Sequence, residues 1–255
     1  MEPLYDRFAD FYAAGPYPRY TRALIELFPT VQERYNLPGK GSLLDAACGE
    51  GTFAVAMAKD GWQVTGIDQS ERMLQHARRK PETAELGIRF LRRDMRSMGF
   101  NAEYDLVTCW FDSLNYLLQY SDLSQAFSSA YQALKPGGYY LMDMNTIYGL
   151  AFTWQQNPYY IQQDQDGIFE VHSTSYDYEN QIASLHITGF VRLPDSGLWE
   201  RMDEIHRERG YPVEQIASLL NTAGFEIIDR IGHLRDFSPP EPETPRVWFI
   251  CRKPA

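Results

Sequence analysis

Short apolar runs alternate with stretches of helical periodicity over the first 145 residues of the chain. An apolar run of about four to eight residues predicts a buried strand, and apolar residues three and four positions apart predict an amphipathic helix. On this ground five strands are predicted, at 43–47, 63–67, 88–91, 104–110 and 139–144. Helices are predicted at 52–59, from Ser70 onward, and at 121–134. This strand–helix repetition predicts a parallel sheet covered by helices on both faces.

The pattern differs at the beginning of the chain and after residue 145. Residues 1–36 read as two helical pieces separated by Pro16 and Pro18. Residues 146–209 contain no convincing helical periodicity and instead predict an antiparallel meander, with strands at 169–176, 183–192 and 199–207. A helix at 213–222 and strands at 224–228 and 247–251 then resume the first pattern. We therefore expect a core made of 1–145 and 210–255, with 146–209 inserted as an antiparallel β lid.

A glycine-bearing loop follows the strand predicted at 43–47, within the segment 43–53 (LLDAACGEGTF). Glycine at a strand-to-helix turn lets the backbone approach a ligand closely, because no Cβ intervenes. Asp68 follows Gly51 by 17 residues and ends the next predicted strand. An ionised carboxylate at that position can accept hydrogen bonds from both hydroxyls of a ribose. The two features predict a cofactor of the adenosine type.

The loop alone does not separate a nicotinamide dinucleotide from S-adenosylmethionine (SAM). Residues 49–54 satisfy the dinucleotide pattern with alanine at its last position. Asp45, however, places a negative charge before the loop, which repels a pyrophosphate and suits a sulfonium and an ammonium. Asp94, followed by Met95, can meet an adenine amino group, and the strands at 224–228 and 247–251 fit a terminal hairpin. These features favour SAM and leave an oxidoreductase as the alternative.

The segment 43–53, Asp68, the pair Asp94–Met95 and the segment 134–138 (LKPGG) together resemble a class I SAM-dependent methyltransferase. The resemblance is close over 43–145 and loose over 212–252. It implies an α/β, Rossmann-like fold with a seven-stranded, mostly parallel sheet whose last strand is reversed. It also implies a SAM site, for which the expected residues are Tyr12, Tyr20, Asp45, Ala47, Gly49, Gly51, Asp68, Gln69, Met73, Asp94, Met95 and Phe111.

Two further segments, 111–117 (FDSLNYL) and 204–211 (EIHRERGY), look like those of bacterial sugar-amine N-methyltransferases that carry a β-sheet lid. This narrower resemblance implies a small-molecule acceptor, methylated on an amine or a hydroxyl. The same region contains His206, which on an extended strand shares a face with Glu204 and Glu208. A neighbouring carboxylate could make His206 a general base, with Glu204 as its partner. A surface histidine in a ladder of charged residues is the alternative.

Composition narrows the class of partner and the compartment. The formal net charge is −10 and the sequence pI about 5.0, which disfavours nucleic acid because a phosphate backbone calls for a positive surface. Three widely spaced cysteines predict neither a disulfide framework nor a metal site. Neither a secretory signal nor a membrane span is visible, so a cytoplasmic protein is expected. The overall prediction is methyl transfer from SAM to a small molecule, and a catalytically silent SAM-binding module remains a second alternative.

Overall fold

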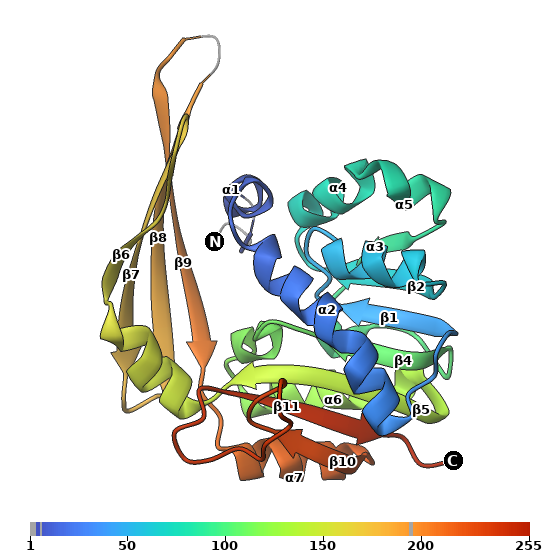
Figure 1. Ribbon diagram of the computed structural model, residues 1–255. Coiled ribbons are helices and arrows are strands. Elements are labelled where there is room, and N and C mark those ends of the chain that lie inside the picture. Colours follow the sequence, from blue (N-terminus) through green and yellow to red (C-terminus); the bar gives the residue numbers. More distant parts are fainter. Residues whose placement is uncertain (1–3, 6, 194–195) are drawn as a thin grey trace.

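The computed structural model describes residues 4–5, 7–193 and 196–255. Residues 1–3 and 6, which belong to the predicted N-terminal helical stretch, lie outside the described residues. Two sheets organise the chain, one of seven strands and one of four. Figure 1 shows the four-stranded sheet standing beside the larger unit, with the N-terminal helix between them.

The large sheet has the strand order β10-β11-β5-β4-β1-β2-β3. Its strands are β1 (Ser42–Ala46), β2 (Gln63–Asp68), β3 (Arg89–Arg92), β4 (Tyr104–Cys109), β5 (Leu134–Asn145), β10 (Glu226–Ile231) and β11 (Arg246–Arg252). Strand β11 runs antiparallel to both of its neighbours, and the other pairs are parallel. The prediction of a Rossmann-like, seven-stranded sheet with a reversed last strand is confirmed.

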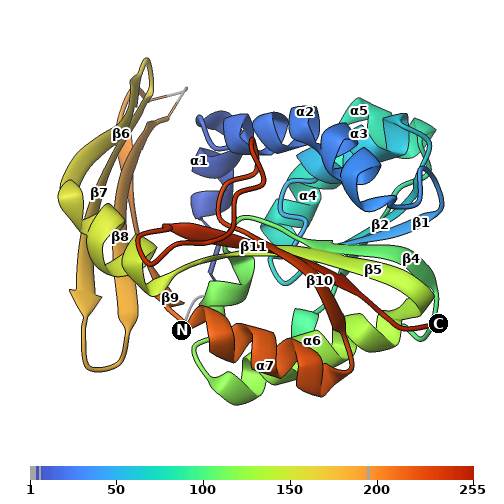
Figure 2. The same cartoon turned by 60° about the horizontal axis from the view of Figure 1, so that its bottom comes forward.

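Helices cover both faces of this sheet (Figure 2). The helices α2 (Pro18–Tyr35), α3 (Thr52–Lys59), α4 (Glu71–Arg79) and α5 (Pro81–Glu85) lie on one face, and α6 (Tyr120–Ala133) and α7 (Val213–Ala223) lie on the other. Each face has its own apolar cluster, so the sheet is buried on both sides. The expected cap at Ser70 is confirmed, because its hydroxyl accepts a hydrogen bond from the Met73 amide at 3.1 Å.

The structure corrects the predicted end of α6. The helix was expected to end at residue 134 and the next strand to begin at residue 139, but β5 already begins at Leu134. Leu134 pairs with Tyr104, and an irregularity between Tyr104 and Leu106 brings the rest of β5 into register with β4. A proline and two glycines therefore enter the strand at a register shift, where ladder hydrogen bonds are interrupted anyway. The short helix α5 was not predicted.

The inserted region forms an antiparallel sheet in the order β6-β7-β8-β9. Its strands are β6 (Tyr159–Gln165), β7 (Ile168–Asp177), β8 (Ile182–Arg192) and β9 (Trp199–Arg209). The last three were predicted, whereas β6 was missed because its sequence is largely polar (YYIQQDQ). The region also holds two short helical segments, Gly149–Thr153 and Trp154–Gln156, where no helix was expected. We call residues 146–209 the lid.

Helix α1 (Phe8–Ala14) fills the space between the lid and α4 (Figure 1). Phe8 and Phe11 form an apolar cluster with Ile187 and Met202 of the lid. On its other side, Asp10 pairs with Arg72 and His76 of α4. The lid therefore meets the core partly through the N-terminal helix.

Among the described residues, no helix combines the length and the apolar character needed to cross a bilayer.

Candidate functional site

The loop between β1 and α3 turns sharply through left-handed backbone conformations. Ala47, Gly49 and Gly51 have φ angles of 57°, 54° and 80°. A Cβ added to Gly49 would meet no atom within 4 Å, whereas one added to Gly51 would lie 2.8 Å from the Phe90 ring. Gly49 therefore presents bare backbone to open space, and Gly51 is needed for packing beneath the loop.

A cavity of about 630 Å³ lies at the carboxyl ends of β1 to β4, beside this loop. In an open α/β sheet this edge is where ligands bind. The cavity is lined by ten of the residues expected from the sequence: Tyr12, Asp45, Ala47, Gly49, Asp68, Gln69, Met73, Asp94, Met95 and Phe111. The same lining includes Tyr5, Thr21, Glu50, Arg96, Trp110, Ser113 and Tyr116, which the sequence analysis did not single out.

Four other expected residues lie outside the lining. Tyr20 is 53% exposed, and its hydroxyl accepts a hydrogen bond from Arg19. Gly51 packs against Phe90, as described above. His206 and Glu204 belong to β9 of the lid, and the residues that line the cavity all fall between Leu4 and Asp122. Tyr5 and Tyr116 line the cavity and contact His206, so they lie between the cavity and this proposed general base.

Three of the carboxylates that line the cavity, Asp45, Asp68 and Asp94, lie at or near the ends of successive strands. Asp68 accepts hydrogen bonds from the Gly49 amide at 2.9 Å and the Ser70 amide at 2.8 Å. It thus holds the glycine loop and the start of α4 together. Burial raises the pKa of Asp68 above its usual value, against the lowering effect of these amides. Burial also raises the pKa of Asp45 to about 7, although a hydrogen bond from Thr108 lowers it.

Asp94 differs from the other two carboxylates. Partial burial acts to raise its pKa, but hydrogen bonds from the Arg96 side chain and amide outweigh it, so the pKa is lowered. Arg96 also forms an ion pair with Asp122 at 3.3 Å. Within the described part of the chain, no group of three or more histidine, cysteine or acidic side chains is arranged to hold a metal ion.

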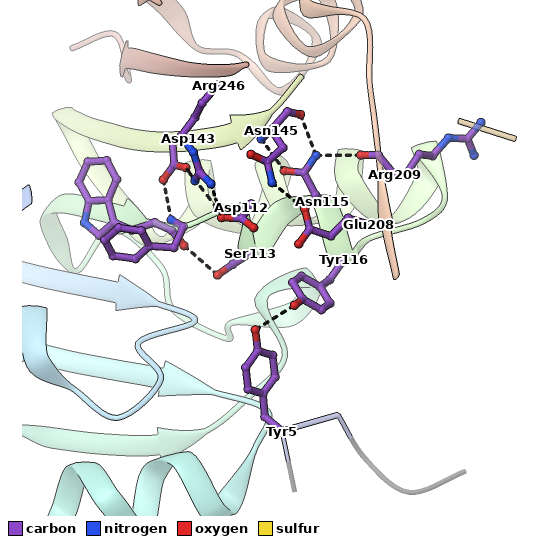
Figure 3. Close-up of polar contacts among 12 residues, drawn as sticks. Tyr5, Asp112, Ser113, Asn115, Tyr116, Asp143, Asn145, Glu208, Arg209 and Arg246 are labelled. Carbon is purple, nitrogen blue, oxygen red and sulfur yellow. Dashed lines mark hydrogen bonds and ion pairs between the residues drawn. The ribbon is translucent and has the colours of Figure 1, made fainter. Parts of the chain in front are cut away.

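A buried polar network joins the end of β4 to the lid and to β11 (Figure 3). Asp143 accepts hydrogen bonds from the amides of Phe111 and Asp112, which have positive φ angles of 57° and 54°. Arg246 pairs with Asp143 and, at 2.7 Å, with Asp112. The carboxyl group of Glu208, on β9, hydrogen bonds to Asp112 in turn. The network fixes a strained turn that forms one wall of the cavity.

Glu208 is 2% exposed, and its carboxyl group also accepts a hydrogen bond from Asn145 at 2.9 Å. Burial, together with the negative charge of Asp112, raises the pKa of Glu208 well above its usual value. The Glu208 carboxyl group therefore holds a proton more strongly than an ordinary glutamate does and can share it with Asp112. Asn115 adds a second link, because its amide nitrogen donates to the carbonyl oxygens of Asn145 and Arg209.

The segments 111–117 and 204–211 thus lie side by side, although the chain separates them by more than 80 residues. Asp112, Asn115 and Tyr116 from the first segment contact Glu208, Arg209 and His206 from the second. Both segments stood out in the sequence, but their contact did not. His206 is 1% exposed, so the alternative of a surface histidine is wrong.

Comparisons with known proteins identify the family. Residues 43–138 match the model of a methyltransferase domain. A protein of Geobacillus sp. (strain WCH70) that carries the name methyltransferase is 35% identical over 229 residues, which are 87% of this chain and 88% of that protein. An N,N-dimethyltransferase of Streptomyces venezuelae, named for a dTDP-linked 3-amino sugar, is 35% identical over 105 residues, 41% of this chain and 43% of that protein.

Comparison with solved structures identifies the same family. The crystal structure of a SAM-dependent methyltransferase from Clostridium acetobutylicum superimposes with a TM-score of 0.80 at 26% identity, covering 99% of this chain and 100% of that one. The open backbone at Gly49 and the acidic strand ends suit a cofactor with cationic and ribose groups, and the oxidoreductase alternative is not favoured. The chain belongs to the class I SAM-dependent methyltransferases.

Proposed function

We propose that the protein transfers the methyl group of SAM to an amine of a small molecule. SAM supplies a methyl group on a sulfonium, which is a good leaving group, so the protein mainly has to orient the reactants and exclude water. In this proposal the core, 1–145 and 210–255, holds the cofactor, with its methionine part at Ala47–Gly49, its ribose at Asp68 and its adenine near Met73, Asp94 and Met95. The lid, 146–209, closes the acceptor end.

The charges around the cavity support an amine. Three cations line it, at the end proposed for the adenine: Arg92 is the last residue of β3, and Arg93 and Arg96 follow that strand. Each of these arginines already has a partner in the protein. Arg92 donates a hydrogen bond to the Gln69 carbonyl oxygen and Arg93 donates one to the Met98 carbonyl oxygen, while Arg96 forms an ion pair with Asp94. The lining also includes Tyr5, Tyr12, Ser113 and Tyr116, which carry hydroxyl groups and which we assign to the acceptor end. Aromatic rings and hydroxyls beside acidic groups suit a cationic amine.

The acidic groups at that end lie on the lid and on the turn after β4. Asp112 directly precedes Ser113 of the lining, and the Glu208 carboxyl group hydrogen bonds to Asp112, so both acids neighbour this part of the cavity. The relatives add a second line of support, since the dimethyltransferase of Streptomyces venezuelae is named for methylation of an amino sugar. The single observation that favours an amine without a phosphate group is a lining that carries tyrosine and serine hydroxyls and arginines that are all engaged by other protein groups.

Paired acceptors test this proposal. The protein is incubated with SAM and either glucosamine or glucose, and in parallel with either putrescine or 1,4-butanediol, and methylated products are identified by mass spectrometry. We expect products from the amine member of a pair and none from its hydroxyl counterpart. Methylation of the hydroxyl members alone would contradict the amine. Binding of SAM without any methylated product would favour the silent SAM-binding module.

The raised pKa of Asp45 predicts how SAM affinity depends on pH. Because burial raises this pKa to about 7, the carboxyl group is mostly protonated below that pH. A nearby sulfonium or ammonium favours the ionised form, so binding of SAM releases a proton. We expect affinity to fall by up to about tenfold per pH unit below about pH 7 and to level off above it. Calorimetry in buffers of different ionisation enthalpy measures the proton release directly, and Asp45→Asn should abolish it. Affinity that is independent of pH between 5 and 8 would assign Asp45 a purely structural role.

A further inference from the structure

A chain of hydrogen bonds runs from the cavity into the lid. The hydroxyl oxygens of Tyr5 and Tyr116 are 2.9 Å apart, and both residues line the cavity. The Tyr116 hydroxyl is also 2.9 Å from Nδ1 of His206. On the far side of the imidazole, Nε2 of His206 lies 3.3 Å from Oε2 of Glu204. Figure 3 shows the first of these contacts at the edge of the polar network.

The chemistry of the four groups sets the direction of these hydrogen bonds. An ionised carboxylate only accepts, so Glu204 requires a proton on Nε2 of His206. Nδ1 of the neutral imidazole then has a free lone pair and accepts the Tyr116 proton. The Tyr116 oxygen in turn accepts the proton of Tyr5. Each group therefore donates its hydrogen bond to the next one along the chain from the cavity to Glu204.

His206 cannot meet an acceptor molecule itself. It is 1% exposed, and the rings of Tyr5 and Phe8 pack edge-on against it, with centroids 4.8 and 5.3 Å away. Its register partner on β8, Leu185, is apolar. The hydroxyl of Tyr116 is therefore the group that connects the imidazole with the cavity. Burial raises the pKa of Tyr116 well above its usual value, so this hydroxyl does not lose its proton unless it gains another.

We propose that Tyr116 is a catalytic residue that takes the proton of the amine acceptor, with His206 and Glu204 as positioning residues behind it. This inference rests on the proposed function. As an N–H bond of the ammonium breaks, its proton bonds to the Tyr116 oxygen while the proton of Tyr116 moves to Nδ1 of His206. The freed lone pair of the nitrogen attacks the methyl carbon, and the electrons of the C–S bond stay on sulfur. Two positive charges enter the step and two leave it, one on the methylated amine and one on His206.

Tyr5 marks the place of the acceptor. Its hydroxyl donates to the same oxygen of Tyr116 that the ammonium must reach, so the acceptor N–H takes the position of the Tyr5 hydroxyl. The titratable groups around this relay are Tyr5 from the N-terminal segment, Asp112 from the turn after β4, and Glu204 and Glu208 from β9. Glu204, and the negative charge that Asp112 and Glu208 carry between them, favour a positive charge on His206 after the transfer.

Nitrogen NMR of the imidazole tests the relay without an acceptor. The ¹⁵N-labelled protein is studied with bound S-adenosylhomocysteine, and the His206 signals are assigned by their absence in His206→Asn. We expect His206 to carry its proton on Nε2 at neutral pH, and Tyr116→Phe to move the Nδ1 signal and its pH titration. Tyr120→Phe is the matched control, because the Tyr120 ring packs on Tyr211 and makes no contact with His206. A proton on Nδ1, or a His206 spectrum unaltered by Tyr116→Phe, overturns the relay.

Kinetics then separate a proton carrier from a merely structural tyrosine. With the amine that is methylated best among the paired acceptors, Tyr116→Phe should lower turnover about ten- to a thousandfold at neutral pH and leave the Kd for SAM unchanged. The deficit should shrink as the pH rises toward the pKa of the amine, because the acceptor then arrives without its extra proton. A deficit that is equal at every pH overturns the catalytic role. If no amine is methylated, the proposed function fails, whereas the NMR result still decides the relay.

Discussion

Replacing Asp68 with alanine is expected to weaken SAM binding about 100-fold or more. In the proposed complex the carboxylate accepts two hydroxyls of the ribose, and a hydrogen bond to a charged group contributes roughly 1.5–3 kcal/mol. The variant also removes the acceptor of the Gly49 and Ser70 amides, so the glycine loop loses an anchor that lies 2.9 Å from its backbone. Both losses act in the same direction on affinity.

Calorimetric titration with SAM and with S-adenosylhomocysteine measures the effect. Asp60→Ala is a suitable control, because Asp60 is exposed at the end of α3 and is not among the residues that line the cavity. Circular dichroism must show that both variants are folded. A folded Asp68→Ala protein with wild-type affinity would remove Asp68 from the proposed cofactor site.

Replacing Arg246 with leucine is expected to lower the free energy of unfolding by about 3–5 kcal/mol, the usual range when one partner of a buried ion pair is removed. Arg246 is the cation between Asp112 and Asp143, and Asp143 is 2% exposed. Burial already raises the pKa of Asp143, and Arg246 lowers it more than the hydrogen bond from the Phe111 amide does. Without the arginine, two acids would face each other and the turn at Phe111 and Asp112 would lose its support.

The loss should depend on pH in a defined direction. Carboxyl groups whose pKa is raised in the folded state stabilise it while they are protonated, and this stability is lost as the pH rises through the folded pKa. The variant should therefore be impaired more at pH 8 than at pH 6. Urea unfolding followed by circular dichroism measures both values. Arg230→Leu serves as the control, since Arg230 forms an exposed ion pair with Glu214 and should contribute at most about 1 kcal/mol. An equally small effect at Arg246 would contradict the structural role of the network.

The strands and helices of the core were predictable because their signals are local. Helix α3 was expected at 52–59 and is observed at Thr52–Lys59, since the spacing of its apolar residues already selects one buried face. Strand β6 was not predictable, because its polar sequence has no apolar alternation, and only pairing with β7 keeps it extended. Likewise, nothing within 134–138 reveals that a register shift lets β5 begin at Leu134.

Some residues of the candidate site could likewise be predicted from the sequence, and others could not. Asp45, Gly49, Asp68 and Asp94 could be placed from the sequence, because each stands at the end of a predicted strand and parallel strands end at one edge of the sheet. Tyr20 was also expected there, but its helix turns it toward solvent. Tyr5 and Tyr116 were not assigned to the cavity, although Tyr116 lies in the segment 111–117, because no local pattern shows which aromatic side chains will line a cavity.

The sequence by itself determined the layered α/β core, the glycine loop, the acidic strand ends and the family, because these depend on patterns within a few neighbouring residues or at fixed spacings. Only the tertiary structure decided which distant groups meet. Tyr116 contacts His206 across 90 positions, and Asp143 pairs with Arg246 across 103. Such contacts depend on the folding of the lid against the turn after β4 and on the reversed strand β11. The energy of a buried hydrogen bond or ion pair depends on how completely the folded chain excludes water around it. No pattern within a few neighbouring residues could therefore specify that energy.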